Sequence, residues 1–316
     1  MVADDAERIR LRPWAVNTSV STVLITGATG FVGSHLTDAL RETDGVDVRV
    51  FVRDADGLDN PAGLDVVEGD LANGDDLGRA LDAVDCAYYL VHSMEAGGGD
   101  FSDRDRELAE AFVAAADRAD VGRIVYLGGI QPSGESSEHL DSRLEVERTL
   151  AKARADFVAL RASMIIGADS ASFRTLAQIV DRLPVLALPK WRDRSTQPVA
   201  IDDVVQALVA AADVPPDSYD IAGPDELTFE AMTEIIADLR GKAHRSVPLP
   251  FTSPKLEGAA AALITDADRE LLTPIMAGLD EDLVIEDNAL HTVFGVVPTP
   301  FREAAGQALA GIATTA

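Results

Sequence analysis

The chain has 316 residues, with 54 acidic side chains against 27 lysines and arginines, and a formal net charge of −27. A surface this acidic repels phosphate groups, so nucleic acid and anionic lipid are disfavoured as partners. No apolar run is long enough to span a bilayer, and the alternating Asp, Glu and Arg of residues 1–14 do not read as a signal peptide. The one cysteine, Cys86, excludes an internal disulfide. We therefore expect a cytoplasmic protein.

The acidic residues are spread along the whole chain and accompany a hydrophobic share of 47%, which is that of a globular protein. Such a composition is similar to that of proteins from halophilic organisms. The length allows one large core, or one core with a smaller lobe. Residues 1–19 are expected to be an N-terminal extension.

Strand and helix signals alternate from residue 20 to residue 222. The predicted strands are Thr22–Thr26, Val46–Val52, Leu64–Glu68, Cys86–Val91, Arg123–Gly128, Phe157–Arg161 and Tyr219–Ala222. The predicted helices between them are Phe31–Arg41, Asp75–Leu81, Arg104–Arg118, Leu140–Arg154, Ser172–Asp181 and Asp202–Ala212. This alternation predicts an α/β fold, a doubly wound parallel sheet of the Rossmann type with helices on both faces.

The pattern changes after Gly223. Residues 228–239, 254–264 and 266–278 read as helices separated by prolines. We therefore expect a Rossmann domain at 20–222 and a small, mostly helical substrate lobe at 223–316, to which residues 183–199 contribute.

The glycine turn after the first predicted strand is the most informative motif. Residues 22–33 read TVLITGATGFVG, so Gly27, Gly30 and Gly33 lie between a strand and a helix. Glycine permits the tight turn, close approach of a pyrophosphate and close packing of helix on strand, and the helix N-terminus favours phosphate. The motif predicts a dinucleotide site, and Thr29, Phe31 and Val32 belong to the same turn.

Arg53 ends the second predicted strand. An acid there would bind ribose hydroxyls, whereas an arginine accommodates a 2′-phosphate, so Arg53 favours NADP. Asp54 stands beside it and leaves NAD open. In the alternative interpretation Arg53 ends a strand in solvent.

The Gly-x-x-Gly-x-x-Gly spacing resembles the short-chain dehydrogenase/reductase superfamily, in its extended and atypical branches, over residues 20–310. The resemblance implies that Asp70 and Leu71 touch the adenine. It also implies that the backbone of Leu90, Val91 and His92 runs beneath the second ribose and the nicotinamide. Leu127 and Gly128 at the end of the fifth strand complete the expected cofactor contacts. An N-cap role for Asp70, and a local carbonyl bond for His92, are the alternatives.

Reductases of this superfamily use a serine after the fifth strand and a Tyr-x-x-x-Lys pair on the next helix. Here a glycine takes the place of the serine, His139 that of the tyrosine and Arg143 that of the lysine. The resemblance implies that His139, with His92 as second candidate, carries the proton. Arg143 is expected to bind ribose or phosphate, and it cannot give up its own proton.

Two later segments resemble the extended branch. Residues 160–167, which contain Met164, resemble a stretch that lines the site, and residues 294–304 resemble the C-terminal signature of sugar-nucleotide epimerases. Residues 197–204 match a segment in which paired acids start a helix, where Asp202 is expected to be the N-cap.

Positive charge gathers at Lys190, Arg192 and Arg194 around Trp191, which is unusual in so acidic a chain. With Gly129 and Met164, the residues Lys190, Trp191 and Arg192 are candidates for an anionic or aromatic substrate. The alternative is a solvated, salt-bridged loop. No metal-ligand spacing is present, so no metal is expected.

Two functions follow. The first is an NAD(P)-dependent oxidoreductase, epimerase or dehydratase that acts on a small carbonyl or sugar-nucleotide substrate without the usual Ser, Tyr and Lys. The second is a non-catalytic NAD(P)H-binding sensor, like the NmrA-like regulators, or an accessory or assembly protein of a respiratory complex. A homodimer is left open.

Overall fold

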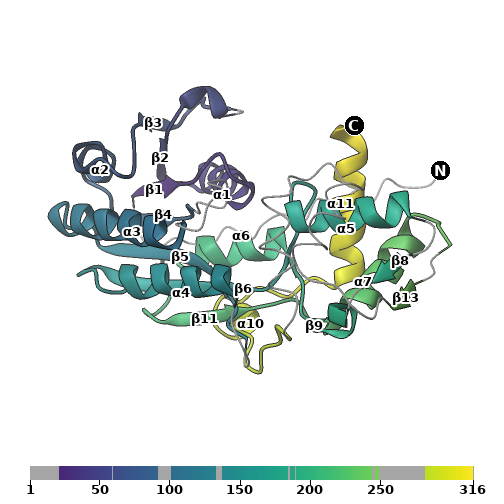
Figure 1. Cartoon of the computed structure of the whole chain (residues 1–316). Coiled ribbons are helices and arrows are strands. Elements are labelled where there is room, and N and C mark those ends of the chain that lie inside the picture. Colours follow the sequence, from purple (N-terminus) through teal and green to yellow (C-terminus); the bar gives the residue numbers. More distant parts are fainter. Residues whose placement is uncertain are drawn as a thin grey trace.

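The computed structural model describes residues 21–58, 60–91, 101–132, 137–183, 186–188, 190–243, 246–248 and 282–315. Figure 1 shows a parallel sheet between helices, with a second group of helices beside it. The expected N-terminal extension and the helices predicted at 254–264 and 266–278 lie outside the described residues.

The central sheet has seven strands in the order β11-β6-β5-β4-β1-β2-β3, and every neighbouring pair is parallel. The strands are β1 (Thr22–Thr26), β2 (Asp47–Val52), β3 (Asp65–Glu68), β4 (Cys86–Tyr89), β5 (Arg123–Gly129), β6 (Asp156–Ala162) and β11 (Ser218–Ile221). The order reverses between β1 and β4, which is where a doubly wound sheet opens a crevice for its ligand. The predicted fold class is confirmed.

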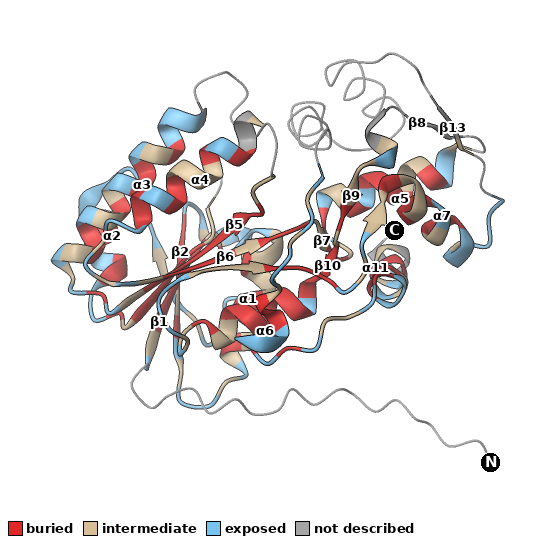
Figure 2. Cartoon of the chain, turned by 90° about the horizontal axis from the view of Figure 1, so that it is seen from below, coloured by how far each residue is buried: buried red, intermediate tan, exposed pale blue. Residues whose placement is uncertain are grey.

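Helices cover both faces of this sheet. They are α1 (Phe31–Arg41), α2 (Gly74–Leu81), α3 (Phe101–Arg118), α4 (Glu138–Leu150), α6 (Ile201–Ala210) and α10 (Ala289–Thr292). Side chains of a strand alternate between the faces, so Leu24 packs with α2, α3 and α4, whereas Val23 and Ile25 pack with α1, α6 and α10. Figure 2 shows the buried residues running along the strands between these layers.

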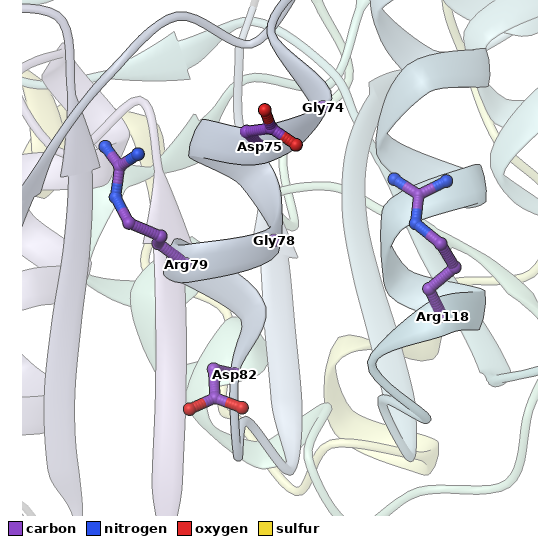
Figure 3. Close-up of a pocket in the computed structure, with 6 residues that line it drawn as sticks. All are labelled: Gly74, Asp75, Gly78, Arg79, Asp82 and Arg118. Atoms are coloured by element: carbon purple, nitrogen blue, oxygen red, sulfur yellow. The ribbon is translucent and has the colours of Figure 1, made fainter.

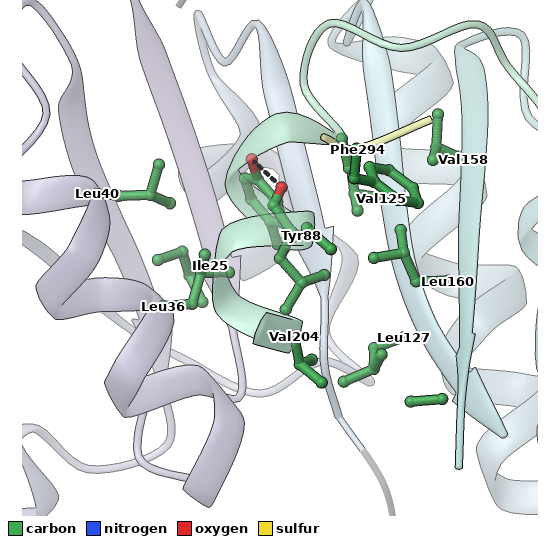
Figure 4. Packing of buried hydrophobic residues seen from close by; sticks show 14 of the residues in the cluster. Ile25, Leu36, Leu40, Tyr88, Val125, Leu127, Val158, Leu160, Val204 and Phe294 are labelled. Carbon is green, nitrogen blue, oxygen red and sulfur yellow. Dashed lines mark hydrogen bonds between the residues drawn. The ribbon is translucent and has the colours of Figure 1, made fainter. Parts of the chain in front are cut away.

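Residues 289–296, late in the chain, help to complete the core on the α1 and α6 face. Tyr88 is fully buried and its hydroxyl donates a hydrogen bond of 3.2 Å to the carbonyl of Leu208 (Figure 4). Phe294 packs edge-on against Tyr219 with ring centroids 5.3 Å apart. The epimerase-like motif at 294–304 therefore begins as core packing. Cys86 lies in the same core, where burial raises the pKa of its thiol to about 12.

A second hydrophobic cluster lies beside the sheet. Its elements are β7 (Ile165–Ile166), β10 (Val199–Ala200), α5 (Ala171–Arg182), α7 (Phe229–Leu239) and α11 (Phe301–Thr315). The short strands of this region are β8 (Leu186–Leu188), β9 (Ser195–Thr196), β12 (Leu227–Thr228) and β13 (Ser246–Pro248). The division into domains at residue 222 stays a prediction, and this cluster draws on residues from both sides of it.

The start of α6 differs from the prediction. The N-cap position is Ala200, and Asp202 lies one residue inside the first turn, so Asp202 does not cap the helix. Its neighbour Asp203 is buried and accepts hydrogen bonds from the amide and the hydroxyl of Thr299, at 2.7 and 2.9 Å. Burial is the main reason why the pKa of Asp203 is raised. Asp203 therefore ties the late segment before α11 to the sheet domain.

Candidate functional site

The turn after β1 needs its first glycine for two reasons. Gly27 has φ +76°, a conformation that L side chains rarely adopt. A Cβ at Gly27 would also lie 2.7 Å from the carbonyl oxygen of Leu90. The turn can therefore run directly against the end of β4 only with glycine at this position.

The other two glycines hold the helix against the turn. A Cβ at Gly33 would lie 2.0 Å from the carbonyl oxygen of Gly27, so α1 can pack this closely only on glycine. Gly30 is the N-cap of α1, and no side chain caps the helix there. The amide groups of the first turn of α1 are therefore left for an anion, and the helix dipole favours one.

The remaining residues of the turn contact the surrounding loops. The ring of Phe31 lies against Gly167, where a Cβ would come within 2.6 Å of it, and it packs edge-on against His35 at 5.4 Å. The methyl group of Thr29 lies 3.5 Å from a Cβ built at Gly57. Val32 packs on the main core. Phe31 thus joins the turn to the loop before α5.

The end of β4 is fastened to the end of β1 by a residue that the motif did not single out. Thr26 Oγ1 donates to the carbonyl of Tyr88 at 3.1 Å and accepts from the amide of Leu90 at 3.3 Å. Leu90 and Val91 are both half-buried beside the glycine turn. His92 lies outside the described residues. A threonine directly before a glycine turn was the signal available in the sequence.

Arg53 and Asp54, at the end of β2, are engaged differently. The side chain of Asp54 accepts a hydrogen bond of 2.9 Å from the amide of Asp56 and caps the short helix η1 (Ala55–Gly57). Arg53 is exposed, and its side chain has no hydrogen bond or ion pair to any residue that the structure describes. The acid therefore has a structural role, and the guanidinium is free to meet a ligand.

Asp70 follows β3 and is exposed. One of its carboxylate oxygens accepts from the amide of Ala72 at 2.9 Å, and its own amide donates to Asp76 at 3.1 Å. The N-cap of α2 is Asn73, so Asp70 is not an N-cap. Leu71 is half-buried against the α2 and α3 face of the core. The pair forms a turn after β3, the edge strand of the sheet.

The end of β5 carries Gly128 and Gly129, both buried. A Cβ at Gly128 would lie 3.0 Å from the ring of Tyr126, and one at Gly129 would lie 3.0 Å from Leu140. These contacts are tight, so the site where the superfamily has its serine is shaped for glycine. Leu127 belongs to the core on the other face of the sheet, the α1 and α6 face.

Arg143 extends from α4 toward this strand end. A Cβ at Gly129 would lie 3.6 Å from Arg143 Cδ and 3.9 Å from Arg143 Nη1. Burial is the main reason why the pKa of Arg143 is lowered. His139 lies in the first turn of the same helix, and its side chain is outside the part that the structure describes.

The proposed substrate residues lie in the region of the second cluster. Met164 packs there, and its carbonyl accepts from the amide of Val199 at 2.9 Å. Arg192 forms ion pairs with Asp193 at 3.3 Å and Glu230 at 3.6 Å. Lys190 and Trp191 lie in the short helix η2 (Lys190–Asp193), and their side chains are outside the description.

The pairing of Arg192 matches the alternative of a salt-bridged loop. Arg194 gives the same picture, because it pairs with Asp282 at 3.6 Å. These two arginines therefore reach carboxylates of the chain itself.

An open hollow of about 600 Å³ lies elsewhere, between α2 and α3 (Figure 3). Its lining residues are Gly74, Asp75, Gly78, Arg79, Asp82 and Arg118. None of the residues singled out in the sequence lines it. Among the described residues, no group of three or more His, Cys, Asp or Glu side chains is placed to hold a metal ion, and no helix is long and apolar enough to cross a membrane.

Comparison with protein families gives one decisive match. The family described as NAD(P)H-binding matches residues 27–175, from the glycine turn to α5. Residues 27–175 form an NAD(P)-binding Rossmann domain. The resemblance found in the sequence is confirmed at this level.

The NAD(P)-binding domain and the rest of the chain are similar to several known proteins. The chain is 26% identical over 298 residues to an Arabidopsis thaliana mitochondrial protein, NADH dehydrogenase (ubiquinone) 1 alpha subcomplex subunit 9. That alignment covers 86% of this chain and 73% of the relative.

Among solved structures, a nucleoside-diphosphate-sugar epimerase from Staphylococcus aureus superposes with a TM-score of 0.73 at 18% identity, covering 90% of this chain and 99% of that one. An NADPH-dependent quinone oxidoreductase from Escherichia coli, complexed with NADPH, gives 0.72 at 18% identity, covering 91% and 99%. At these identities the two structures show a shared fold.

Proposed function

We propose that the chain is an NADP-dependent oxidoreductase or epimerase-type enzyme that acts on a small carbonyl or sugar-nucleotide substrate. The observation that carries the proposal is the uncapped N-terminus of α1 at the end of β1, with the unpaired guanidinium of Arg53 one strand away. The first offers amides to a pyrophosphate, and the second offers a charge to a 2′-phosphate.

Arg53 also distinguishes the two dinucleotides. An acid that reads the ribose hydroxyls would have to be free, and the carboxylate of Asp54 is already used by the amide of Asp56. A guanidinium binds phosphate through paired, charge-assisted hydrogen bonds. These contacts support NADP over NAD.

The chemistry would take place at the ends of β4 and β5. NADPH, when bound, supplies a hydride. In this proposal the imidazole of His139, at the position of the superfamily's tyrosine, holds and donates the proton, and His92 is the second candidate. Gly129 leaves the strand end without a hydroxyl, and Arg143 supplies positive charge beside it.

A second function has its own support. The relative that aligns with 86% of this chain is a subunit of an NADH dehydrogenase, and the tight packing at Gly129 leaves little room for the usual serine. Both observations favour a protein that binds NAD(P)H without turning it over, as an accessory or assembly factor.

Calorimetry with NADPH and NADH tests the cofactor assignment. We expect Arg53→Ala to weaken NADPH by about 10- to 100-fold, because hydrogen bonds to charged groups contribute about 1.5–3 kcal/mol, and to leave NADH nearly unchanged. Arg104→Ala, on the exposed surface of α3, is the control and should change neither affinity. Equal losses for both cofactors in Arg53→Ala would contradict the assignment.

A panel of carbonyl compounds and sugar nucleotides separates enzyme from accessory protein. Turnover of NADPH with any member supports the enzyme. Tight NADPH binding with no turnover across the panel would make the accessory role the better proposal.

A further inference from the structure

In the described part of the chain, Arg143 has a guanidinium donor without a hydrogen-bond partner, although Tyr126 and the buried carboxylate of Asp105 lie near enough to attract its charge. Its Nε is buried, and no acceptor among the described residues lies within hydrogen-bonding distance of it. No described carboxylate forms an ion pair with the side chain. The backbone is nonetheless held in place, since the hydroxyl of Tyr126 donates to the carbonyl of Arg143 at 3.1 Å.

The same helix shows how this chain pairs a half-buried arginine when the role is structural. One turn further along α4, Glu147 accepts two hydrogen bonds from Arg161, at 2.6 and 3.0 Å, and a third from Ser218 at 2.8 Å. A charge withdrawn from water is costly unless it is paired. Asp105 attracts the Arg143 charge, but no ion pair or hydrogen bond joins the two among the described contacts, and Nε stays unpartnered.

The strands that lead to the expected phosphate contacts of the cofactor are not the neighbours of β5. In the sheet order, β5 lies two strands from β1 and three strands from β2. With strands about 4.8 Å apart, Gly129 is about 10 Å along the sheet from the strand that leads into the pyrophosphate turn, and about 14 Å from the strand of Arg53. The strand order therefore favours an anion of the second ligand over the cofactor phosphates as the partner of Arg143.

We propose that Arg143 binds an anionic oxygen group, a carboxylate or phosphate, on the substrate itself beside Gly129. The inference rests on the proposed function, since it places a substrate next to the nicotinamide end of NADP. The planar fork of arginine suits such groups because it donates two parallel hydrogen bonds. A serine at position 129 would place its Cβ 3.6 Å from Arg143 Cδ and 3.9 Å from Nη1, so the glycine keeps a competing side chain away from the guanidinium.

The test titrates the full chain, saturated with NADPH, with oxalate and with inorganic phosphate at constant ionic strength. The two probes distinguish a carboxylate site from a phosphate site. We expect Arg143→Met to weaken the preferred anion at least tenfold, and by a larger factor than it weakens NADPH. Arg143→Lys keeps the charge, so its anion affinity should lie between that of the unchanged chain and that of Arg143→Met. Arg148→Met, exposed on the same helix, is the control and should behave as the unchanged chain does.

Three results would overturn the inference. The unchanged chain could bind neither anion, or Arg143→Met could bind both anions as tightly as the unchanged chain. In the third, Arg143→Met loses NADPH affinity and keeps its anion affinity. Failure of the unchanged chain to bind NADPH would refute the proposed function, and the anion titration of the free protein would still decide the role of Arg143. Should Arg143→Met not fold, Gly129→Ser and Arg143→Lys carry the test, and an anion affinity that neither changes overturns the inference.

Discussion

Gly33 is the residue at which one added methyl group should cost most. A Cβ there would lie 2.0 Å from the carbonyl oxygen of Gly27, and a backbone atom cannot move aside as a side chain can. We expect Gly33→Ala to lower the free energy of unfolding by about 2–3 kcal/mol, as overpacking does, and to abolish NADPH binding. Denaturant unfolding and calorimetry measure the two effects.

Gly78 provides the matched control, because it is a helical glycine on α2 with nothing within 4 Å of a Cβ. Gly78→Ala should raise the free energy of unfolding by about 0.5–1 kcal/mol, the helix preference of alanine over glycine. A Gly33→Ala chain as stable as the parent, with normal NADPH affinity, would show that α1 can move away from the turn at little cost.

The proposed proton donor can be tested by its titration. General acid catalysis is typically worth about 10²–10⁴-fold, so His139→Ala should lower kcat by that order while NADPH affinity holds. In the reducing direction the imidazolium is the acid, so the rate of the parent should fall as pH rises through an apparent pKa of about 6–8.

His291→Ala, on α10, is the control for the general effects of removing a histidine. Full turnover in His139→Ala would remove this residue from the mechanism and leave His92→Ala as the next variant to measure.

At this scale the sequence predicts residues that act through backbone geometry better than residues that act through partners. Gly27, Gly30 and Gly33 are recognisable because a strand precedes them and a helix follows. The sequence does not reveal that Asp54 caps η1 or that Arg143 approaches Gly129. Each of these contacts is one of several that the sequence would allow.

At the scale of the elements, one carboxylate accepts several hydrogen bonds from the start of β1. One oxygen of Asp85 accepts from the amides of Ser21 and Thr22, at 2.8 and 2.9 Å, and from the hydroxyl of Ser21 at 3.0 Å. The bond from the Thr22 amide is the largest cause of the lowered pKa of Asp85, and burial opposes it.

The lowered pKa fixes the sign of a pH dependence. Because the folded pKa lies below the unfolded value of 3.8, the stabilisation is present above that value and is lost as pH falls through the folded pKa. Asp85→Asn should therefore lower the free energy of unfolding by about 1 kcal/mol at neutral pH, and the difference from the parent should shrink as the pH falls below 3.8.

Urea unfolding of both chains across this range is the measurement. Asp47→Asn, at the exposed start of β2, is the control and should follow the parent at every pH. A difference that stays constant however far the pH falls below 3.8 would mean that the carboxylate charge does not stabilise the start of β1.

The long elements of the sheet domain follow from periodicity, and their observed ends lie close to the predicted ones. The two-residue strands β7 and β10 carry no repeat that a pattern could detect. Residues 301–315 are rich in Ala, Gly and Thr, and the helix α11 that they form packs on α7 and on β7 and β10. Tertiary contact, rather than the local pattern, explains these elements.

For the whole molecule, the charge of −27 predicts a dependence on salt. Acids outnumber bases two to one, so self-repulsion outweighs the surface ion pairs, and screening should favour the compact state. The Debye length falls from ~30 Å at 0.01 M to ~3 Å at 1 M. Thermal unfolding should therefore shift to higher temperature from low to molar KCl.

NaCl at the same ionic strength should act like KCl, because screening depends on ionic strength. A thermal unfolding midpoint that stays constant or falls over this range of salt would contradict the halophilic character expected from the composition.

The overall architecture was predictable because alternating strands and helices, with a glycine turn at the first crossover, allow few arrangements of the sheet. The second cluster was not, because it combines residues near 164–183, 199–200, 227–237 and 301–312. Only the folded chain shows which of these segments meet.

The late position of residues 289–309 has a consequence for the order in which the protein matures during its synthesis. Leu290 and Phe294 complete the core on the α1 and α6 face, where Phe294 packs on Tyr219 of β11, and Phe301 and Ala305 complete the second cluster. A nascent chain that has exposed all seven strands still lacks both closures while these residues remain inside the ribosome. The sheet must therefore wait, partly open and vulnerable to proteases and to association with other chains, until these late segments leave the ribosome and complete both cores.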